Sequence, residues 1–403
     1  MSRTVNERII LGMLTKLSHG TLTLTLPSGE IQKLGVSSTP ESPPNSLQAD
    51  LHIFDSGVFT DIVRGGDIAF AECFMAGRVR TKNLPALLKL FVKNREAVHD
   101  ALHGRWWGVL FDRLRHVFRR NSKAQARKNI EAHYDLGNDF YTLWLDPSMT
   151  YSSALFASAE ADSDTSLSDA QQAKYQRVLG QLGNAQNILE IGCGWGGFAE
   201  VASKAGRHVT GLTLSTEQLI YAKERLAKLG RTEAADLKLQ DYRDEGVHAS
   251  NQYDGVASIE MFEAVGESYW PSYFECISRN LKPGGKACIQ SITIRDELFE
   301  RYRSGTDFIQ RYIFPGGMLP SPSAFQEAAS RAGLRVVDRF AFGQDYARTL
   351  AMWRSNFLDK LPEVRALGYP EKFIRMWDFY LAYCEAGFES GDTDVMHFTL
   401  EKS

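Results

Sequence analysis

A glycine-rich segment, Asn187–Phe198, carries the residue types best suited to hold a nucleotide-like ligand. An apolar run from Ile188 to Ile191 predicts a strand, glycines crowd positions 192–197, and a helical pattern begins at Phe198. Glycines let the backbone turn sharply and let a ligand approach it without a Cβ in between. This strand, turn and helix start is the cofactor-binding place of many α/β sheets, although a glycine-rich turn without a ligand is the alternative.

Glu190 helps to decide which cofactor the turn would bind. The spacing of Gly192, Gly194 and Gly197 also fits the dinucleotide pattern. However, a carboxylate at the strand end, directly before the first glycine, suits an ammonium group and would repel a pyrophosphate. Dinucleotide sites also need an acid about 20 residues further on, and the next predicted strand ends at Thr213 without one. The pattern therefore favours S-adenosylmethionine over NAD.

Glu217 is the acid nearest to that distance, but it falls at the start of a predicted helix, Thr216–Leu226. There it has a simpler role in compensating the helix dipole. Ser215 is the predicted N-cap of this helix, with Gln218 as its capping-box partner.

Later strand ends fit the same interpretation. A third strand, Leu237–Leu239, is followed by polar side chains at Asp241 and Tyr242, which are placed to hold an adenine edge. A strand at Tyr253–Ile259, a turn at Leu281–Gly285 and a strand at Lys286–Ile294 follow. This order resembles a class I methyltransferase, which implies an α/β fold with a Rossmann-like, doubly wound sheet.

Composition limits the other possibilities. The 403 residues are 43% apolar, enough for two or three domains. The five cysteines are scattered without CxxC pairs, so we expect no disulfide framework and no metal site, and a reducing cytoplasm. A net charge of −3 does not suggest nucleic-acid binding. We expect no signal peptide and no membrane-spanning segment, because no run of about 20 apolar residues occurs.

Residues 96–128 form a basic stretch between two different patterns. Within it, aromatic and apolar residues recur at helical spacing between arginines, as in Arg105–Arg120. Such a helix can lie on an anionic membrane surface, or it can be a linker whose apolar stripe docks on the next domain.

Residues 1–95 predict a small α+β domain. Alternating strands are expected at Thr21–Leu26 and Ala49–Phe54, and helices at Phe59–Val63, Asp67–Ala76 and Leu84–Val92. The apolar face of its sheet could bury an acyl chain or only its own core. The chain thus divides into this domain, the helical linker at 96–128 and a catalytic domain at 129–403.

Motifs along the last part resemble, in order, those of the cyclopropane fatty acid synthase family. The matching segments are Ala132–Tyr141, Met149–Ser153, Glu190–Gly197, Gly211–Gln218, Gln240–Asp244, Met261–Gly266, Arg311–Pro320 and Phe342–Leu350. The first domain and linker are also similar in size and placement to those of the bacterial phospholipid-modifying members. There the first domain is thought to help engage the lipid.

The resemblance implies a reaction between S-adenosylmethionine and membrane phospholipid. A cis double bond of an unsaturated acyl chain attacks the sulfonium methyl, and the resulting carbocation loses a proton to close a cyclopropane ring. Such chemistry needs a dry apolar slot, negative or π-rich walls and a base beside the new methyl. The cofactor-binding residues implied are Tyr151, Ser152, Glu190, Gly192, Gly194, Trp195, Gly196, Thr213, Leu214, Gln218, Asp241 and Tyr242.

The family holds a bound bicarbonate in a polar catalytic cluster, and this chain matches that cluster in part. Glu263 matches the family carboxylate, Tyr346 the tyrosine, and Ile292 the position that offers its backbone to the anion. Ser153 stands where many members have cysteine, and Gln290 where many have histidine. Both can still donate to an anion, but glutamine cannot be protonated.

The histidine that commonly follows the family glutamate is replaced as well, by Ala264. These three departures leave the product open. Ring closure is the first expectation. A fatty acyl methyltransferase that leaves a methyl-branched or methylated unsaturated chain is the second, because the placement of the proton acceptor decides between them. A degenerate lipid-binding module and a small-molecule methyltransferase are weaker alternatives.

Residues around these motifs have two interpretations each. Tyr312, Phe314 and Pro315 are expected to line the acyl slot, although an aromatic loop is more often simple core. His133 and Tyr134 would either shape a lid over the cofactor or cap a helix. Cys384 and Trp353 are expected to pack in the core. Family members are often dimers, and a peripheral position on the inner face of the membrane is expected.

Overall fold

The structure of this chain is a computed structural model, and it describes residues 3–35, 47–95, 136–156 and 165–402. The predicted basic helix at 96–128, together with His133 and Tyr134, lies outside the described residues.

The first part of the chain folds as a sheet with helices. Its elements are α1 (Val5–Leu14), β1 (Thr21–Thr25), β2 (Ile31–Gly35), β3 (Gln48–Ile53), α2 (Gly57–Met75), β4 (Val79–Arg80) and α3 (Leu84–Lys93). The sheet order is β2-β1-β3-β4, with β1 parallel to β3 and antiparallel to β2. Alternate residues of the strands, such as Leu22, Leu24 and Leu51, are buried, as period-2 patterns predict.

Helix α2 (Gly57–Met75) consists of two helical segments, as predicted for Phe59–Val63 and Asp67–Ala76. They meet at Gly66, whose φ of 59° and ψ of −136° are not helical. Glycine adopts this left-handed conformation without a steric cost, so the chain bends at this residue with no intervening loop.

The second part contains the larger sheet. Its strands are β5 (Asn187–Ile191), β6 (His208–Thr213), β7 (Ala235–Leu239), β8 (Tyr253–Ile259), β9 (Leu281–Ile294), β10 (Leu334–Ala341) and β11 (Thr393–Lys402). Its helices are α7 (Asn138–Thr142), α8 (Leu167–Gln181), α9 (Gly197–Lys204), α10 (Thr216–Lys228), α11 (Trp270–Asn280), α12 (Asp296–Ser304), α13 (Phe308–Tyr312), α14 (Pro322–Arg331), α15 (Gly343–Asp359), α16 (Leu361–Ala366) and α17 (Glu371–Ser390). Short 3₁₀ turns are η1 (Thr232–Ala234), η2 (Tyr242–Asp244), η3 (Phe262–Ala264) and η4 (Glu267–Tyr269).

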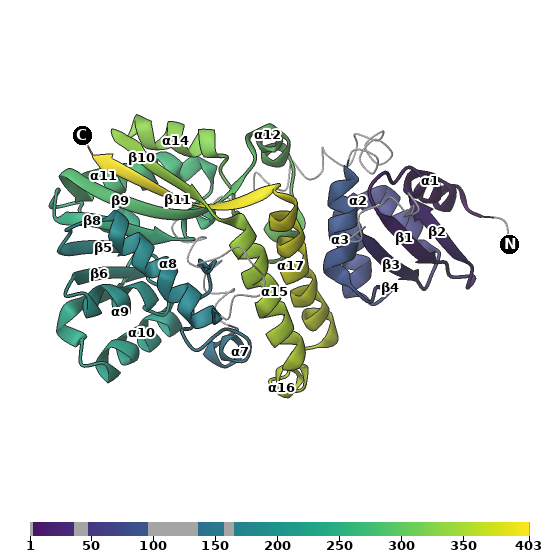
Figure 1. Cartoon of the computed structure of the whole chain (residues 1–403), viewed down its shortest axis with the longest axis horizontal. Helices are drawn as coiled ribbons and strands as arrows, with labels where there is room; N and C mark the ends of the chain where they lie inside the picture. The colour runs from purple at the N-terminus through teal and green to yellow at the C-terminus, as the bar shows by residue number, and fades with distance from the viewer. Residues whose placement is uncertain (1–2, 36–46, 96–135, 157–164, 403) are drawn as a thin grey trace.

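The seven strands pair in the order β10-β11-β9-β8-β5-β6-β7 (Figure 1). β5, β6, β7, β8 and β9 are parallel, whereas β11 runs antiparallel to both β9 and β10. The strand order reverses between β5 and β8, which is the topological switch point where α/β sheets bind ligands. The predicted α/β, doubly wound, Rossmann-like class is therefore confirmed, together with a small α+β sheet before it.

The turn predicted at Leu281–Gly285 is absorbed into β9. Leu281 already pairs with Tyr253, and the register then shifts so that Gly255 pairs with Lys286. The Pro and Gly residues thus form an irregularity within the strand instead of a loop ahead of it.

Separate apolar cores cover the two faces of this sheet. One is built from α8, α9 and α10 and includes Val178, Phe198 and Leu226. The other is built from α11 and α14, where Phe274 and Phe325 meet edge to face at 5.1 Å. Both cores hold the strand ends in fixed positions.

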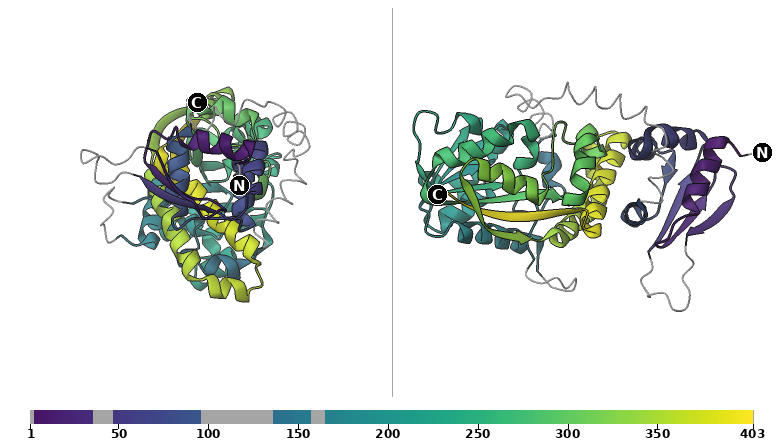
Figure 2. Two further views of the ribbon diagram at one scale, coloured as in Figure 1. Left: turned by 90° about the vertical axis from the view of Figure 1, so that its right-hand side faces the viewer. Right: turned by 90° about the horizontal axis from the view of Figure 1, so that it is seen from above.

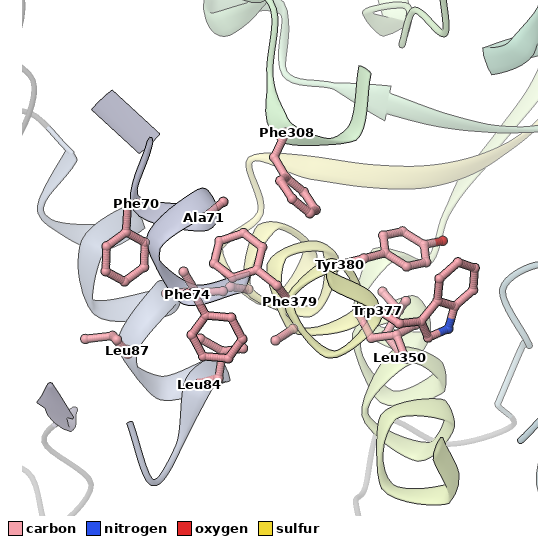
Figure 3. Packing of buried hydrophobic residues seen from close by; sticks show 14 of the residues in the cluster. Phe70, Ala71, Phe74, Leu84, Leu87, Phe308, Leu350, Trp377, Phe379 and Tyr380 are labelled. Atoms are coloured by element: carbon pink, nitrogen blue, oxygen red, sulfur yellow. The ribbon is translucent and has the colours of Figure 1, made fainter. Parts of the chain in front are cut away.

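Helices α15 and α17 join the two parts of the molecule. They lie between the larger sheet and the first domain, which forms the far end of an elongated molecule (Figures 1 and 2). Phe379 of α17 packs against Phe74 of α2 at 5.6 Å and against Phe308 at 4.8 Å between ring centroids (Figure 3). The Nε of Arg375 also donates to the carbonyl of Met75 at 2.8 Å. One continuous apolar core therefore spans both parts.

Among the residues described here, no helix is long and apolar enough to cross a membrane.

Candidate functional site

The glycine loop lies between β5 and α9 and forms the sharp turn that its sequence predicted. Gly192 has a φ of 86°, and a Cβ there would come within 2.9 Å of the Met261 side chain. Gly196 is the N-cap of α9 with a φ of 80°, and a Cβ there would lie 3.0 Å from that of Ala222. A Cβ on Gly194 would meet nothing within 4 Å, so this glycine faces open space. The loop thus presents bare backbone to a cavity.

That cavity has a volume of about 1070 Å³ and extends from the glycine loop into the first domain. The residues predicted to bind the cofactor line it, except Gly196. Those that line it are Tyr151, Ser152, Glu190, Gly192, Gly194, Trp195, Thr213, Leu214, Gln218, Asp241 and Tyr242. Of the predicted catalytic residues, Glu263, Ile292 and Tyr346 line it, whereas Ser153 and Gln290 are fully buried and do not.

Glu190 is a buried acid with spare hydrogen-bonding capacity. Its Oε2 has no hydrogen-bond partner among the described residues. Burial raises the pKa of this carboxyl to about 8, against the opposing charges of Lys174 and Arg225. A buried, unpartnered carboxylate oxygen favours a cationic donor, since an ion pair with hydrogen bonds offsets its desolvation. The amino-acid ammonium of S-adenosylmethionine fits this oxygen.

The N-terminus of α10 shapes the neighbouring wall. The Ser215 Oγ accepts from the N–H of Gln218 at 3.3 Å, as the predicted N-cap requires. The second half of the expected capping box is not formed. Instead, the Thr213 hydroxyl donates to the Gln218 side chain at 3.0 Å and accepts from the Ser215 N–H at 3.1 Å.

Asp241 follows β7 at the cavity wall, where it was predicted to hold an adenine edge. Both of its carboxylate oxygens accept from Arg243, at 2.8 and 2.6 Å, and one also accepts from the Arg243 N–H. The Asp241 side chain therefore fixes turn η2 through its ion pair with Arg243.

Glu260 lies at the centre of the polar cluster, although the sequence did not single it out. The N–H of Ser153 donates to its Oε1 at 2.8 Å, and Nε2 of Gln290 donates to the same oxygen at 2.7 Å. The Tyr346 hydroxyl donates to its Oε2 at 2.6 Å. The family resemblance assigned Ser153, Gln290 and Tyr346 to a bound bicarbonate. Because all three donate to Glu260, they do not also fit a second anion at the same place.

The Ser153 hydroxyl itself points elsewhere, since it donates to the carbonyl of Ala154 at 2.9 Å. Gln290 is fixed from its other side, because its Oε1 lies 2.8 Å from Nε2 of His397. Burial lowers the pKa of His397 to about 3, so this ring is neutral. The contacts of Ser153 and Gln290 therefore orient Glu260 from behind the cavity wall.

Glu263 lines the same cavity as Glu260 but has a different hydrogen-bond partner. It accepts a short hydrogen bond from the Ile292 N–H, while its Oε2 has no partner among the described residues. Burial, followed by the charge of Glu260, raises the pKa of Glu263 to about 8. Two carboxyl groups therefore share one cavity, and repulsion between them disfavours double ionisation.

Lys174 supplies a buried positive charge to this group of acids. Its Nζ donates to the Ser152 hydroxyl at 2.5 Å and lies 4.3 Å from the centroid of the Tyr175 ring. Burial lowers the pKa of Lys174 to about 7, while the charge of Glu260 raises it.

The aromatic residues predicted around the acyl slot divide into two groups. Phe314 and Pro315 line the cavity, as does Cys384, which packs against the main core. Tyr312 does not line it. Its hydroxyl donates to Glu72 of α2, so it belongs to the contact between the two parts of the molecule. Trp353 is fully buried in the core.

One sequence signal could have found Glu260. It directly follows β8, at the same carboxyl edge of the parallel sheet that drew attention to Glu190 at the end of β5. The matched motif began one residue later, at Met261, and so left it out.

Comparisons with known proteins identify the family of this chain. Residues 121–398 match the family model described as "Mycolic acid cyclopropane synthetase". The chain is 40% identical over 346 residues to the tuberculostearic acid methyltransferase UfaA1 of Mycobacterium tuberculosis, covering 84% of this chain and 80% of the relative. It is 33% identical over 360 residues to the cyclopropane-fatty-acyl-phospholipid synthase of Escherichia coli K12, covering 89% of each.

A solved structure shares the fold of the catalytic part. The mycolic acid cyclopropane synthase CmaA1, in complex with SAH and CTAB, superimposes with a TM-score of 0.62 at 33% identity, over 68% of this chain and 98% of that one. The sheet order, the glycine loop and the paired carboxyl groups therefore occur in a chain whose sequence matches the family over most of its length. The chain belongs to the cyclopropane fatty acid synthase family of S-adenosylmethionine-dependent methyltransferases.

Proposed function

We propose that this protein transfers the methyl group of S-adenosylmethionine to a cis double bond of an unsaturated acyl chain in membrane phospholipid. The product we propose is a methylated acyl chain that is still unsaturated. The observation that carries the proposal is the single cavity that joins the glycine loop, two carboxyl groups and a long apolar slot.

The cofactor end of the cavity fits S-adenosylmethionine. Glu190 offers an ammonium group an oxygen that has no partner in the described part of the chain, and the bare backbone at Gly194 leaves room for the ligand. When bound, S-adenosylmethionine supplies an electrophilic methyl on a sulfonium. The SAH in the related CmaA1 complex supports the same use of this loop.

The apolar end fits an acyl chain. Side chains of the first domain, among them Ile10, Leu14, Phe70 and Phe91, line the cavity together with Phe314 and Phe379 of the catalytic part. Its volume of about 1070 Å³ slightly exceeds the range of about 300–1,000 Å³ that is usual for ligand sites. An apolar slot excludes water from a cationic intermediate, which would otherwise be captured by hydrolysis.

Each bond that forms in the proposed reaction is matched by a bond that breaks. The π pair of the double bond forms a new C–C bond to the methyl, the C–S bond breaks, and the neighbouring carbon becomes cationic. A carboxylate then accepts a proton from the cationic chain, and the C–H pair forms a new double bond. No reductant is needed for this product.

Departures from the family cluster support an unsaturated product over ring closure. Ser153, Gln290 and Ala264 replace common family residues, and Glu260 takes the donors of the anion site. The similarity to a named tuberculostearic acid methyltransferase supports methyl addition without ring closure. Ring closure, which the family resemblance placed first, is the second candidate, supported by the E. coli relative.

We place the reaction on the inner, anionic face of a membrane. The basic stretch at 96–128 supports this, as does the phospholipid in the name of the E. coli relative. Sedimentation with vesicles tests it. Binding to vesicles rich in phosphatidylglycerol but not to neutral phosphatidylcholine vesicles is expected, and equal binding to both would contradict an electrostatic attachment.

The test of the proposed product uses a bacterial host that lacks its own synthase. Expression of the chain should add one carbon to the unsaturated acyl chains of the host phospholipids. Mild catalytic hydrogenation should then change the mass of the new fatty acid, because an alkene is reduced while a cyclopropane resists. A one-carbon product that survives hydrogenation would establish ring closure instead.

A further inference from the structure

We propose that Glu260 is the protein's own catalytic anion, which takes the place of a bound inorganic anion and accepts the proton released by the carbocation. This inference rests on the proposed function, and it names the proton acceptor of that reaction.

Three donors from separate elements converge on this one carboxylate. They come from the loop before α8 (Ser153), from β9 (Gln290) and from α15 (Tyr346), at 2.6 to 2.8 Å. Donors arranged in this way bind an anion strongly, since each is held in place before the anion charge is needed. A carboxylate and a bicarbonate present the same pair of oxygens, so the Glu260 side chain completes a site that would otherwise hold a small anion.

The backbone conformation of Glu260 is a second observation in favour of a functional role for this residue. Its φ is 50°, in the left-handed region where a side chain carries a cost of about 1–2 kcal/mol and glycine carries none. Such backbone outliers gather at functional sites, where the surrounding structure holds them. A glycine would satisfy the backbone better, yet it would leave the three donors without an acceptor.

The other charged and titratable groups nearby decide how this anion behaves. Glu263 from η3 faces the same cavity and raises the cost of a second negative charge. Lys174 from α8 favours the ionised form of Glu260, and the Tyr346 and Gln290 hydrogen bonds act in the same direction against burial. The pair therefore carries one negative charge most readily, and the three donors place that charge on Glu260.

The chemical step balances without any further reactant. Methyl transfer leaves a cation on the chain carbon adjacent to the one that now bears the methyl group, and an oxygen of Glu260 accepts one proton from a carbon bonded to that cationic centre. The C–H electron pair becomes the new π bond, and Glu260 becomes a neutral carboxyl. Release of that proton to water restores the site.

Two substitutions of Glu260 separate the effect of its charge from the effect of its volume. Glu260→Gln keeps the shape and removes the charge, while Glu260→Gly opens the site and relieves the backbone. Glu260→Gln should lower kcat by about 100-fold or more, the usual contribution of a general base. Glu260→Gly should be as slow, and thermal unfolding checks that it folds, because the relief of the backbone is offset by the three donors left without an acceptor. Glu385→Gln on α17 is the matched control, since the Oε2 of this partly buried carboxyl has no partner in the part of the chain that the structure describes, and the residue lies outside the cavity.

Dependence on bicarbonate gives the decisive comparison. The assay uses purified full-length protein, vesicles of cis-unsaturated phosphatidylglycerol and buffer freed of dissolved CO₂. Wild-type turnover should be unchanged when bicarbonate is added. The Glu260→Gly variant should gain about tenfold or more with bicarbonate or formate, whereas Glu260→Gln should not, because its amide fills the site. A wild-type enzyme that needs bicarbonate, or a Glu260→Gln variant with full turnover, would overturn the proposal.

A measurement of bicarbonate binding that does not depend on turnover distinguishes the role of Glu260 from the proposed function. ¹³C-bicarbonate NMR should show line broadening with Glu260→Gly and none with wild type. If no unsaturated phospholipid is methylated by wild type but this binding pattern holds, the proposed function fails and Glu260 still occupies the anion site. If wild type methylates lipid and also binds bicarbonate, the function stands and the role of Glu260 is refuted.

Discussion

Three glutamates in a mainly apolar cavity are the main chemical feature of this protein. Glu190, Glu260 and Glu263 all line it, and burial raises the pKa of each carboxyl above its ordinary value. Burying several carboxyl groups together does not stabilise the folded protein, because each group loses its hydration. Their presence is consistent with binding a cation at one end of the cavity and forming one at the other.

Glu190→Gln should weaken S-adenosylmethionine binding by about 10- to 100-fold. The substitution removes a charge-assisted hydrogen bond, which contributes about 1.5–3 kcal/mol. Isothermal titration calorimetry measures the change in Kd. Glu217→Gln is the matched control, because Glu217 is exposed at the start of α10 and should have no effect. An unchanged Kd for Glu190→Gln would exclude Glu190 as the ammonium partner.

The same substitution should change how stability depends on pH. The pKa of Glu190 is about 8 in the folded protein, well above the unfolded value of about 4.3. Its stabilising contribution is complete below pH 4.3 and is lost as pH rises through 8. Without ligand, Glu190→Gln should therefore unfold at a higher temperature than wild type near pH 8, with the difference shrinking towards pH 5. Thermal unfolding across this range checks it, and parallel curves would contradict the assigned shift.

Sequence reasoning identified some of these residues and missed others for a physical reason. Glu190 and Glu263 stand in segments whose residue order is distinctive. Glu260 becomes visible only when β8, β9 and α15 come together, because its donors are 30 to 107 residues away in the chain. A contact across such separations depends on the fold and leaves no local pattern in the sequence.

At the scale of elements, the carboxyl ends of the parallel strands build the cofactor site. β5 ends at the glycine loop, β6 at the cap of α10, and β7 at the Asp241–Arg243 ion pair. The apolar runs and the cap residue predicted these elements closely. They did not predict that Thr213 replaces half of the capping box, since that depends on side-chain rotamers.

Gly192→Ala should damage the loop more than an ordinary glycine substitution. The φ of 86° alone costs about 1–2 kcal/mol with a side chain, and the new Cβ would also press on Met261. Gly206→Ala is the matched control, because Gly206 has a φ of 75° and open space at its Cβ. Thermal unfolding should show a larger loss for Gly192→Ala, with weaker S-adenosylmethionine binding in that variant alone. Equal losses in both variants would show that contact with Met261 has no role.

At the scale of the whole molecule, α17 makes the first domain part of the site. Phe379 joins the helices of both parts, and an ion pair between Lys89 and Glu389 at 2.7 Å adds a polar contact. The sequence suggested either an acyl-binding sheet or a separate core for residues 1–95. The structure shows that side chains of this domain line the same cavity as the glycine loop.

Phe91→Trp should shorten the slot from the side of the first domain. The larger ring extends into the cavity that Phe91 lines, so the rate with longer unsaturated acyl chains should fall relative to shorter ones. The Kd for S-adenosylmethionine should not change. Lys93→Trp, on the exposed side of α3, provides the control. Identical chain-length preferences in wild type and Phe91→Trp would argue against an acyl chain in this part of the cavity.

The most direct test of the central claim is a reconstituted reaction with a labelled methyl group. Purified protein, S-adenosylmethionine with a ¹³C methyl and vesicles of cis-unsaturated phosphatidylglycerol are incubated, and the released fatty acids are analysed by mass spectrometry. The account predicts one labelled carbon on the former double bond, in a chain that mild hydrogenation still reduces. Vesicle lipids that carry no label while S-adenosylmethionine binds normally would contradict it.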